Sequence, residues 1–407
     1  MKPTHGGALR RERIRSLNQS AVINAIHRYG RISRTDLAAE LHLSPAAITS
    51  ITAPFVEEGL VIEAEVGVSA SVGRKPILLG INYDHSYVLG MKVMNQAVLA
   101  SLTNLNAEVK QVRGVPLTST DVDSVLDAIT ELTTQLKGAA GVAPQRVIGL
   151  GVSLPGVVDL TAGSVRHSEL LGWDTVPLAD LLQSRLGLPT LVENDVNALA
   201  AAHAWFGHGR DHGSFLVVTV GRGVGLGIVI GGQLYRGPRG GAGELGHTRA
   251  TPIAPRVMTP ATTTLEGLLG DAALLRQARA LVPGFGPEDG VEELTKRAAN
   301  GNAAALDLLA DAGSCLGVAI ADLVNVFAPT LVILGGEGMR NGAFLLPHVR
   351  SALDEYVFGG LGDELELVVD TWGDDAWARG AAGLAAARFL EAATIPLEAA
   401  GATMGSD

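Results

Sequence analysis

The feature that most constrains the fold of this chain is the segment from Val220 to Gly227, in which every second residue from Gly221 onward is glycine. Apolar β-type runs flank it and predict a hairpin. Glycine has no Cβ, so backbone N–H groups in such a turn can approach a phosphate or sugar oxygen closely. Tight hairpins and bulges need the same residues, so the loop indicates a ligand site only if other evidence lies beside it.

Two polar motifs flank this glycine loop along the chain. Asn194 and Asp195 precede it, and Glu244 and His247 follow it. A sugar presents hydroxyl groups that both donate and accept hydrogen bonds, so converging carboxylates, an amide and an imidazole can satisfy them in pairs. The alternatives are structural: Asn194 or Asp195 would suit the N-cap of a helix, and a single histidine is more often a structural residue.

Length and composition set the class of protein. The chain has 407 residues, 47% of them hydrophobic, which is enough for two or three domains. The single cysteine excludes an internal disulfide framework. The sequence shows no secretory leader and no apolar run near about 18 residues, so we expect a cytoplasmic protein that does not enter a membrane.

The charge distribution is uneven. The net charge is −11, yet the first 80 residues hold 10 Lys and Arg against 7 Asp and Glu. This balance is compatible with a small basic module on an acidic body.

Helical signals open the chain. Val22, Ile23 and Ile26 predict a first helix that ends near Gly30, and Ser33 offers the N-cap of a second. A turn then leads to a third helix predicted from about residue 45 to residue 58. Two helices joined by a short turn are typical of a helix-turn-helix, whose second helix enters the major groove of DNA.

The start of the third helix carries the candidate DNA contacts. These residues are small, so the helix could lie deep against base edges, and their hydroxyl groups could reach bases or phosphates. They are Ser44, Pro45, Ala46, Ala47, Thr49 and Ser50. The alternative is a three-helix module that binds another protein.

A wing is expected after the third helix. Strand-like runs near residues 61–63 and 68–79 enclose a flexible loop, and Arg74 and Lys75 at its base could contact the minor groove or phosphates. A solvated turn is the competing interpretation. We assign residues 1–80 to a winged helix-turn-helix domain.

The remaining chain alternates strand-like and helix-like runs in two similar halves. Strands are expected near residues 87–94, 97–104, 108–115, 146–152, 214–221, 224–231, 330–334 and 366–370, and helices near 121–137, 303–327 and 376–391. This order predicts a two-lobed α/β body with a ligand cleft between a first lobe, residues 81–200, and a second lobe, residues 201–407.

The order and spacing of these motifs resemble the ROK family (repressors, open reading frames and kinases), in particular its winged-helix transcriptional regulators of sugar metabolism. Besides the motifs above, the resemblance rests on residues 43–45, 73–76, 154–159 and 334–336. It implies an actin-like ATPase (ribonuclease H-like) body that binds a hexose-type ligand. The family's sugar contacts carry over to Asn194, Asp195, Glu244, His247 and Glu266, with Asp195 at the position of the general base in family kinases.

The chain departs from the family's kinases in the first lobe. Residues 89–95 read Leu-Gly-Met-Lys-Val-Met-Asn where the kinases carry an Asp-x-Gly-Gly-Thr loop that holds Mg²⁺ and the ATP phosphates. Without those groups nothing stabilises the charge that develops on a transferred phosphoryl. We therefore expect no kinase activity.

Two further departures concern metal and phosphate. Residues 248–264 contain no cysteine where many relatives carry a zinc-binding cluster, so we expect no metal and no cofactor. Arg222 stands where the kinases usually carry threonine. With Gly223 it could hold the phosphate of a sugar 6-phosphate, which would then bind more tightly than the free sugar; the alternative is a brace that pairs with a nearby carboxylate.

The sequence thus predicts a transcriptional repressor of carbohydrate metabolism whose body binds a sugar or sugar phosphate. We expect it to read an inverted-repeat operator as a homodimer or homotetramer. The alternatives are a sugar kinase with an added DNA-binding module and a regulator that answers only to a protein partner.

Overall fold

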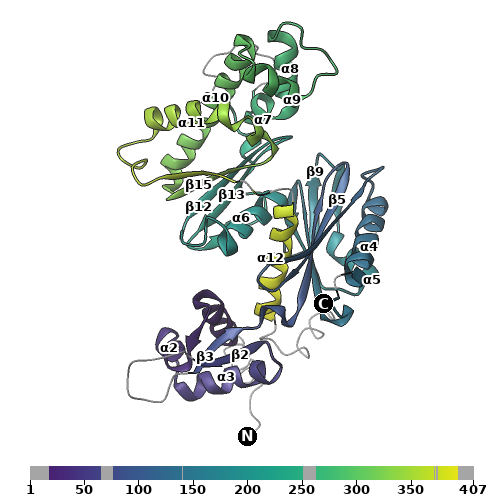
Figure 1. The fold of residues 1–407 in the computed structure, drawn as a ribbon, viewed down its shortest axis with the longest axis vertical. Helices are drawn as coiled ribbons and strands as arrows, with labels where there is room; N and C mark the ends of the chain where they lie inside the picture. Colours follow the sequence, from purple (N-terminus) through teal and green to yellow (C-terminus); the bar gives the residue numbers. More distant parts are fainter. Residues whose placement is uncertain are drawn as a thin grey trace.

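The computed structural model describes residues 18–65, 77–139, 141–250, 263–370, 372 and 375–392. It consists of a small N-terminal module and two lobes, each built around a five-stranded sheet (Figure 1). The candidate DNA contacts Arg74 and Lys75 lie outside the described residues.

The N-terminal module has the order of a winged helix-turn-helix. Residues 18–29 are helical and are followed by β1 (Ile32–Ser33), α2 (Arg34–Glu40), α3 (Pro45–Glu57), β2 (Val61–Glu65) and β3 (Ile77–Ile81). The strands form an antiparallel sheet in the order β1-β3-β2. β2 and β3 flank the segment expected to form the wing, whose tip lies outside the described residues.

Local capping signals set the starts of both helices of the motif. The Ser33 hydroxyl accepts a hydrogen bond from the Asp36 N–H at 3.1 Å, and the Ser44 hydroxyl accepts one from the Ala47 N–H at 3.2 Å. Pro45 occupies the first position of α3, where no N–H is needed. The predicted second and third helices are confirmed.

The first lobe is a mixed sheet in the order β11-β7-β4-β5-β6. An antiparallel meander of β4 (Tyr87–Val93), β5 (Ala97–Asn104) and β6 (Val109–Pro116) is extended by two parallel strands, β7 (Val147–Leu154) and β11 (Thr190–Asn194). α4 (Val122–Ala139) and α5 (Leu178–Leu186) cover one face, and α12 (Asp375–Ala392) covers the other (Figure 1). A small sheet that the sequence did not predict follows β7: β8 (Val157–Asp159), β9 (Ser164–Ser168) and β10 (Trp173–Val176).

The second lobe repeats this plan in the order β14-β13-β12-β15-β16. Its strands are β12 (Phe215–Val220), β13 (Val224–Ile230), β14 (Gln233–Leu234), β15 (Leu331–Gly335) and β16 (Glu366–Val369). The predicted hairpin is confirmed, because β12 pairs antiparallel with β13 across the glycine loop.

Successive residues of β12 face opposite sides of this sheet. Leu216 and Val218 belong to one apolar cluster with α7 (Leu265–Leu269), α8 (Asp271–Leu281), α9 (Val291–Ala299), α10 (Ala303–Phe327) and α11 (Gly342–Tyr356). Phe215 and Val217 pack instead with α6 (Asp195–Phe206). This alternation explains why the strand is apolar throughout.

α10 corrects the expectation that the chain has no long apolar run. Among the described residues it is the one helix long and apolar enough to cross a membrane, with a mean hydropathy of 1.6 over 18 residues. Its buried residues, which include Leu308, Leu316 and Ile320, pack inside the second lobe against neighbouring helices. Burial between helices accounts for its composition.

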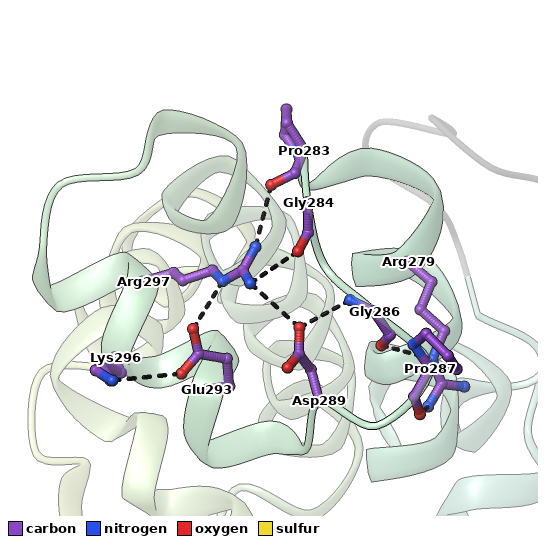
Figure 2. Close-up of polar contacts among 9 residues, drawn as sticks. All are labelled: Arg279, Pro283, Gly284, Gly286, Pro287, Asp289, Glu293, Lys296 and Arg297. Atoms are coloured by element: carbon purple, nitrogen blue, oxygen red, sulfur yellow. Dashed lines mark hydrogen bonds and ion pairs between the residues drawn. The ribbon is translucent and has the colours of Figure 1, made fainter.

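Arg297 holds the connection between α8 and α9. Its guanidinium donates to the carbonyl oxygens of Pro283 at 3.0 Å and Gly284 at 2.9 Å, and it pairs with Asp289 at 3.2 Å and Glu293 at 2.9 Å (Figure 2). These bonds satisfy loop carbonyl groups that have no partner in regular secondary structure.

α12 joins all three parts of the molecule. Glycines on the first-lobe strands admit it, because a Cβ at Gly90 would overlap the carbonyl oxygen of Ala378, and one at Gly151 would overlap that of Ala381. Farther along, α12 shares an apolar cluster with the N-terminal module through Ala382, Ala386 and Leu390. The range predicted as the second lobe, residues 201–407, therefore includes a helix that packs on the first-lobe sheet. The sequence could not show this, because apolar periodicity predicts that a helix is buried but not which sheet buries it.

We predict that Gly90→Ala destabilises the protein by about 1–3 kcal/mol, the usual cost of overpacking, because α12 must move away from β4. Gly138→Ala in α4 is the matched control. A Cβ there meets nothing within 4 Å, so this change should stabilise by about 0.5–1 kcal/mol. Urea unfolding followed by circular dichroism measures both, and equal effects would contradict the packing role of Gly90.

Candidate functional site

A cleft of about 760 Å³ lies between the two lobes. The first lobe contributes residues at the ends of β4, β7 and β11, and the second contributes the glycine loop and segments near residues 240–247 and 336–337. The cleft brings together every ligand residue that the sequence predicted: Asn194, Asp195, Arg222, Gly223, Glu244, His247 and Glu266.

Asn194 ends β11 and caps α6. Its Oδ1 accepts a hydrogen bond from the Asn197 N–H at 3.1 Å, and its Nδ2 donates to the Gly156 carbonyl oxygen at 3.0 Å. The capping interpretation is therefore confirmed. One amide hydrogen and one lone pair remain for a ligand, so capping and sugar binding are compatible.

Glu193, which is buried beside Asn194, holds this part of the cleft wall in place. It is 2% exposed, and its carboxylate pairs with Arg236 at 2.5 Å. The same group accepts hydrogen bonds from the Asn194 N–H at 2.9 Å and from the Asn197 side chain at 3.1 Å. A buried carboxylate with all these partners holds the start of α6 in place.

Asp195 is the first residue of α6, and its Oδ1 accepts a hydrogen bond from the Val196 N–H at 2.9 Å. Burial raises the pKa of Asp195, although the nearby Lys92 ammonium opposes the shift. Glu337, on the second-lobe side of the cleft, raises the pKa further.

Lys92 is a site residue that the sequence analysis missed. It lies on β4, where family kinases carry their phosphate loop, and is 5% exposed. Its Nζ lies 4.2 Å from the centre of the Trp377 ring, at cation–π distance. A lysine inside an otherwise apolar strand was the available signal, because such a charge remains buried only with a specific partner.

The glycine loop packs closely against two glutamates. Glu266 Oε2 accepts a hydrogen bond from the Val224 N–H at 3.1 Å, and a Cβ at Gly223 would lie 2.8 Å from the same oxygen. A Cβ at Gly221 would overlap Glu337. Gly221 and Gly223 thus leave room for carboxylates beside the loop, whereas a Cβ at Gly225 or Gly227 would meet α6 at Val196 and Ala200.

Arg222 reaches from the glycine loop to the first lobe. Its Nη1 donates to the side-chain oxygen of Asn95, in the turn between β4 and β5. The sequence analysis considered a phosphate or a nearby carboxylate as its partner, and the structure instead shows an amide on the other lobe. The bond spans the cleft.

Glu244 and His247 lie on the solvent-exposed side of the cleft. Their side chains are 44% and 61% exposed, and His247 Nε2 lies 3.9 Å from Glu244 Oε2. Burial raises the pKa of Glu244, and the charge of His247 opposes the shift. His167 lines the cleft from β9, and its hydrogen bond to Asp174 at 2.7 Å raises the pKa of His167. The sequence analysis missed His167 because it did not predict the small sheet.

The described part of the chain holds no group of three His, Cys, Asp or Glu side chains that could bind a metal ion. Residues 251–262, in the segment where relatives carry zinc ligands, are outside it. Cys315 lies in α10, where burial raises the pKa of its thiol to about 11. The absence of zinc remains a prediction.

The start of α3 presents the predicted DNA contacts. Ser44, Pro45, Ala46, Thr49 and Ser50 are exposed, and Ala47 is partly buried. The opposite side of α3 enters the module core through Ile48, Ile51 and Phe55. The helix thus leaves a face of small residues open to a partner.

The N-terminal module contacts both lobes. His27, on its first helix, lies with its ring centre 4.7 Å from that of Trp205, near the end of α6. His27 Nδ1 is also 2.9 Å from the hydroxyl of Tyr83, in the segment that joins the module to the first lobe. Burial lowers the pKa of His27, and the charge of Arg210 lowers it further. The helix that begins at Asp195 in the cleft therefore ends against the N-terminal module.

Family comparisons agree with this architecture. A winged helix-turn-helix DNA-binding model matches residues 15–62, and the model of the ROK family matches residues 89–388. The chain belongs to the ROK family. The expected order, a winged helix-turn-helix followed by an actin-like body, is confirmed.

Both regulators and kinases of the ROK family are similar to this chain. A xylose repressor from Caldicellulosiruptor bescii is 28% identical over 358 residues, which cover 85% of this chain and 89% of that protein. The crystal structure of a ROK transcriptional regulator, a homologue of Escherichia coli MLC, aligns with a TM-score of 0.81 and 28% identity over 94% of this chain and 99% of that one. A ROK glucokinase from Streptomyces griseus, solved with glucose and AMPPNP, aligns with a TM-score of 0.62 and 26% identity over 74% and 99%.

The raised pKa of Asp195 predicts a pH-dependent stability. Because burial favours the protonated form, the native state holds this proton more tightly than the unfolded state, and the free energy of unfolding falls as pH rises from about 4 through the raised native pKa. Asp195→Asn has no proton to lose. It should be more stable than the unmutated protein at pH 7, with the difference shrinking toward pH 4.

Urea unfolding across this pH range measures the difference. Asp363→Asn, at an exposed loop position, is the control and should change the free energy of unfolding little. A difference for Asp195→Asn that stays constant with pH would contradict the role of burial.

Proposed function

We propose that this protein is a sugar-responsive transcriptional repressor of carbohydrate metabolism. The observation that carries the proposal is that one continuous framework connects an exposed helix-turn-helix to a cleft lined by all the predicted sugar contacts. The xylose repressor and the ROK regulator resemble this chain over both parts, whereas the glucokinase covers only 74% of it.

The presence of Lys92 argues against the kinase alternative. Phosphoryl transfer needs a metal ion and backbone donors around the phosphates. At the corresponding strand this chain has a buried lysine that lies against Trp377 and within electrostatic reach of Asp195. We propose that Asp195 binds a sugar hydroxyl without activating it, and that the protein is not an enzyme. Turnover of xylose or glucose with Mg-ATP would favour the kinase instead.

α6 offers a physical route from the sugar to the DNA-binding module. It packs on the second-lobe sheet, whereas α12 packs on the first, and the N-terminal module touches both helices. If a sugar changes the angle between the lobes, α6 moves relative to α12. The contact between His27 and Trp205 must then shift, and the module with it.

DNA recognition points to an oligomer. Helix-turn-helix proteins generally read two half-sites about one helical turn apart, and the symmetry of the operator follows that of the protein. We propose a homodimer or homotetramer on an inverted-repeat operator. A repressor acts where the DNA is, so we place the protein in the cytoplasm.

The DNA-binding face can be tested with charge. The double variant Thr49→Glu/Ser50→Glu should weaken DNA binding by about a hundredfold or more, because two carboxylates would face phosphates. Fluorescence anisotropy, with DNA selected by the unmutated protein from a random pool, measures the affinity. The same charges at Thr134 and Ser351, exposed on α4 and α11, are the control and should have no effect. Retained binding by the first variant would overturn the assignment of α3.

The route through α6 can be tested at Trp205. Trp205→Leu keeps an apolar side chain but removes the ring contact with His27. We expect this variant to bind sugar and DNA normally. The factor by which sugar changes its DNA affinity should be about tenfold smaller, which corresponds to the loss of a typical coupling between two sites. Tyr235→Leu, at an aromatic residue that is 49% exposed, serves as the control. Full coupling in Trp205→Leu would show that the signal takes another path.

A further inference from the structure

The charge of the cleft bears on whether it accepts free or phosphorylated sugars. This inference rests on the proposed function, in which the cleft binds a sugar. Five carboxylates line the cleft, against one lysine, one arginine and the two histidines His167 and His247. The carboxylates are Glu169, Asp195, Glu244, Glu266 and Glu337. A phosphate ester carries nearly two negative charges at neutral pH and would enter a site that is already acidic.

The carboxylates are concentrated where a phosphate would have to lie. Glu266 and Glu337 both lie against the glycine loop, at Gly223 and Gly221. Like charges so close to the loop oppose an anion there.

The N–H groups of the loop are partly committed to the protein. The Gly221 N–H donates to the Gly223 carbonyl oxygen at 3.0 Å, and the Val224 N–H donates to Glu266 at 3.1 Å. A phosphate cradle needs such groups to point at the ligand. Here a carboxylate already accepts from one of them.

The lysine and the arginine of the cleft are also engaged. The Arg222 guanidinium donates to Asn95 on the other lobe. Lys92 lies 4.2 Å from the centre of the Trp377 ring, and its charge lowers the pKa of Asp195. A phosphate would therefore compete with Asn95 for Arg222, and with Asp195 and Trp377 for Lys92.

We infer that the effector is an uncharged sugar, and that Glu266 and Glu337 exclude phosphorylated sugars from the glycine loop. This reverses the expectation from sequence that Arg222 favours a 6-phosphate. Carboxylates that repel phosphate accept hydrogen bonds from sugar hydroxyls, so the same groups serve affinity and selectivity. Arg222 instead bonds Asn95 across the cleft.

Isothermal titration calorimetry tests the inference on the full chain. Xylose, glucose and N-acetylglucosamine are each compared with the 5- or 6-phosphate ester at low salt. We expect the sugar that binds to do so about tenfold or more tightly than its ester, a difference of about 1.4 kcal/mol. Because the exclusion is electrostatic, the preference should shrink as salt concentration is raised.

The variant Glu337→Gln tests whether this residue excludes the phosphate esters. Removing this charge should narrow the preference for the free sugar by about threefold to tenfold. Glu364→Gln, at an exposed position outside the cleft lining, should leave it unchanged. The salt series on the unmutated protein requires no variant, so the test does not depend on the folding of Glu337→Gln.

The outcomes separate this inference from the proposed function. An ester that binds as tightly as the free sugar, or more tightly, overturns the inference and leaves the sugar-responsive repressor intact. If none of the sugars or esters binds, the effector site fails and the inference fails with it. A preference for free sugar that does not respond to salt or to Glu337→Gln would refute the electrostatic cause.

Discussion

The close packing of α12 at three glycines, one of which is its own, is the constraint on which the rest of the structure depends. Gly90 and Gly151 admit the helix to the first-lobe sheet, and Gly380 of α12 itself meets the carbonyl oxygen of Ala198 on α6. Each contact brings backbone against backbone, which only a residue without Cβ allows. This packing sets the distance between the lobes, the shape of the cleft and the position of the N-terminal module.

The same packing makes the cleft and the DNA-binding module parts of one mechanical unit. The module does not hang from a linker: its core continues into α12, and His27 reaches α6. α6 in turn begins with Asp195, inside the cleft. In the proposed repressor one helix would couple the two sites directly, because α6 begins at a predicted sugar contact and ends against the N-terminal module.

We propose that one set of charges disfavours phosphoryl transfer and favours sugar binding in this cleft. Lys92 supplies a buried positive charge near Asp195 on the strand where kinases bind phosphate, and Glu266 and Glu337 place negative charge against the glycine loop. A site arranged in this way presents donors and acceptors to hydroxyl groups, and its carboxylates beside the glycine loop oppose an anion there.

Local signals determined much of this protein. Ser33, Ser44 and Pro45 placed the helices of the N-terminal module, and strand-like apolar runs placed the strands of both lobes, because caps and runs of this kind act between residues close in sequence. The polar motifs and the glycine loop likewise marked the residues that line the cleft. Tertiary structure alone decided that Arg222 bonds Asn95, that Lys92 lies against Trp377, and that α12 belongs to the first-lobe sheet. These contacts join residues more than a hundred positions apart, and no local pattern encodes which distant surface a side chain or a helix will meet.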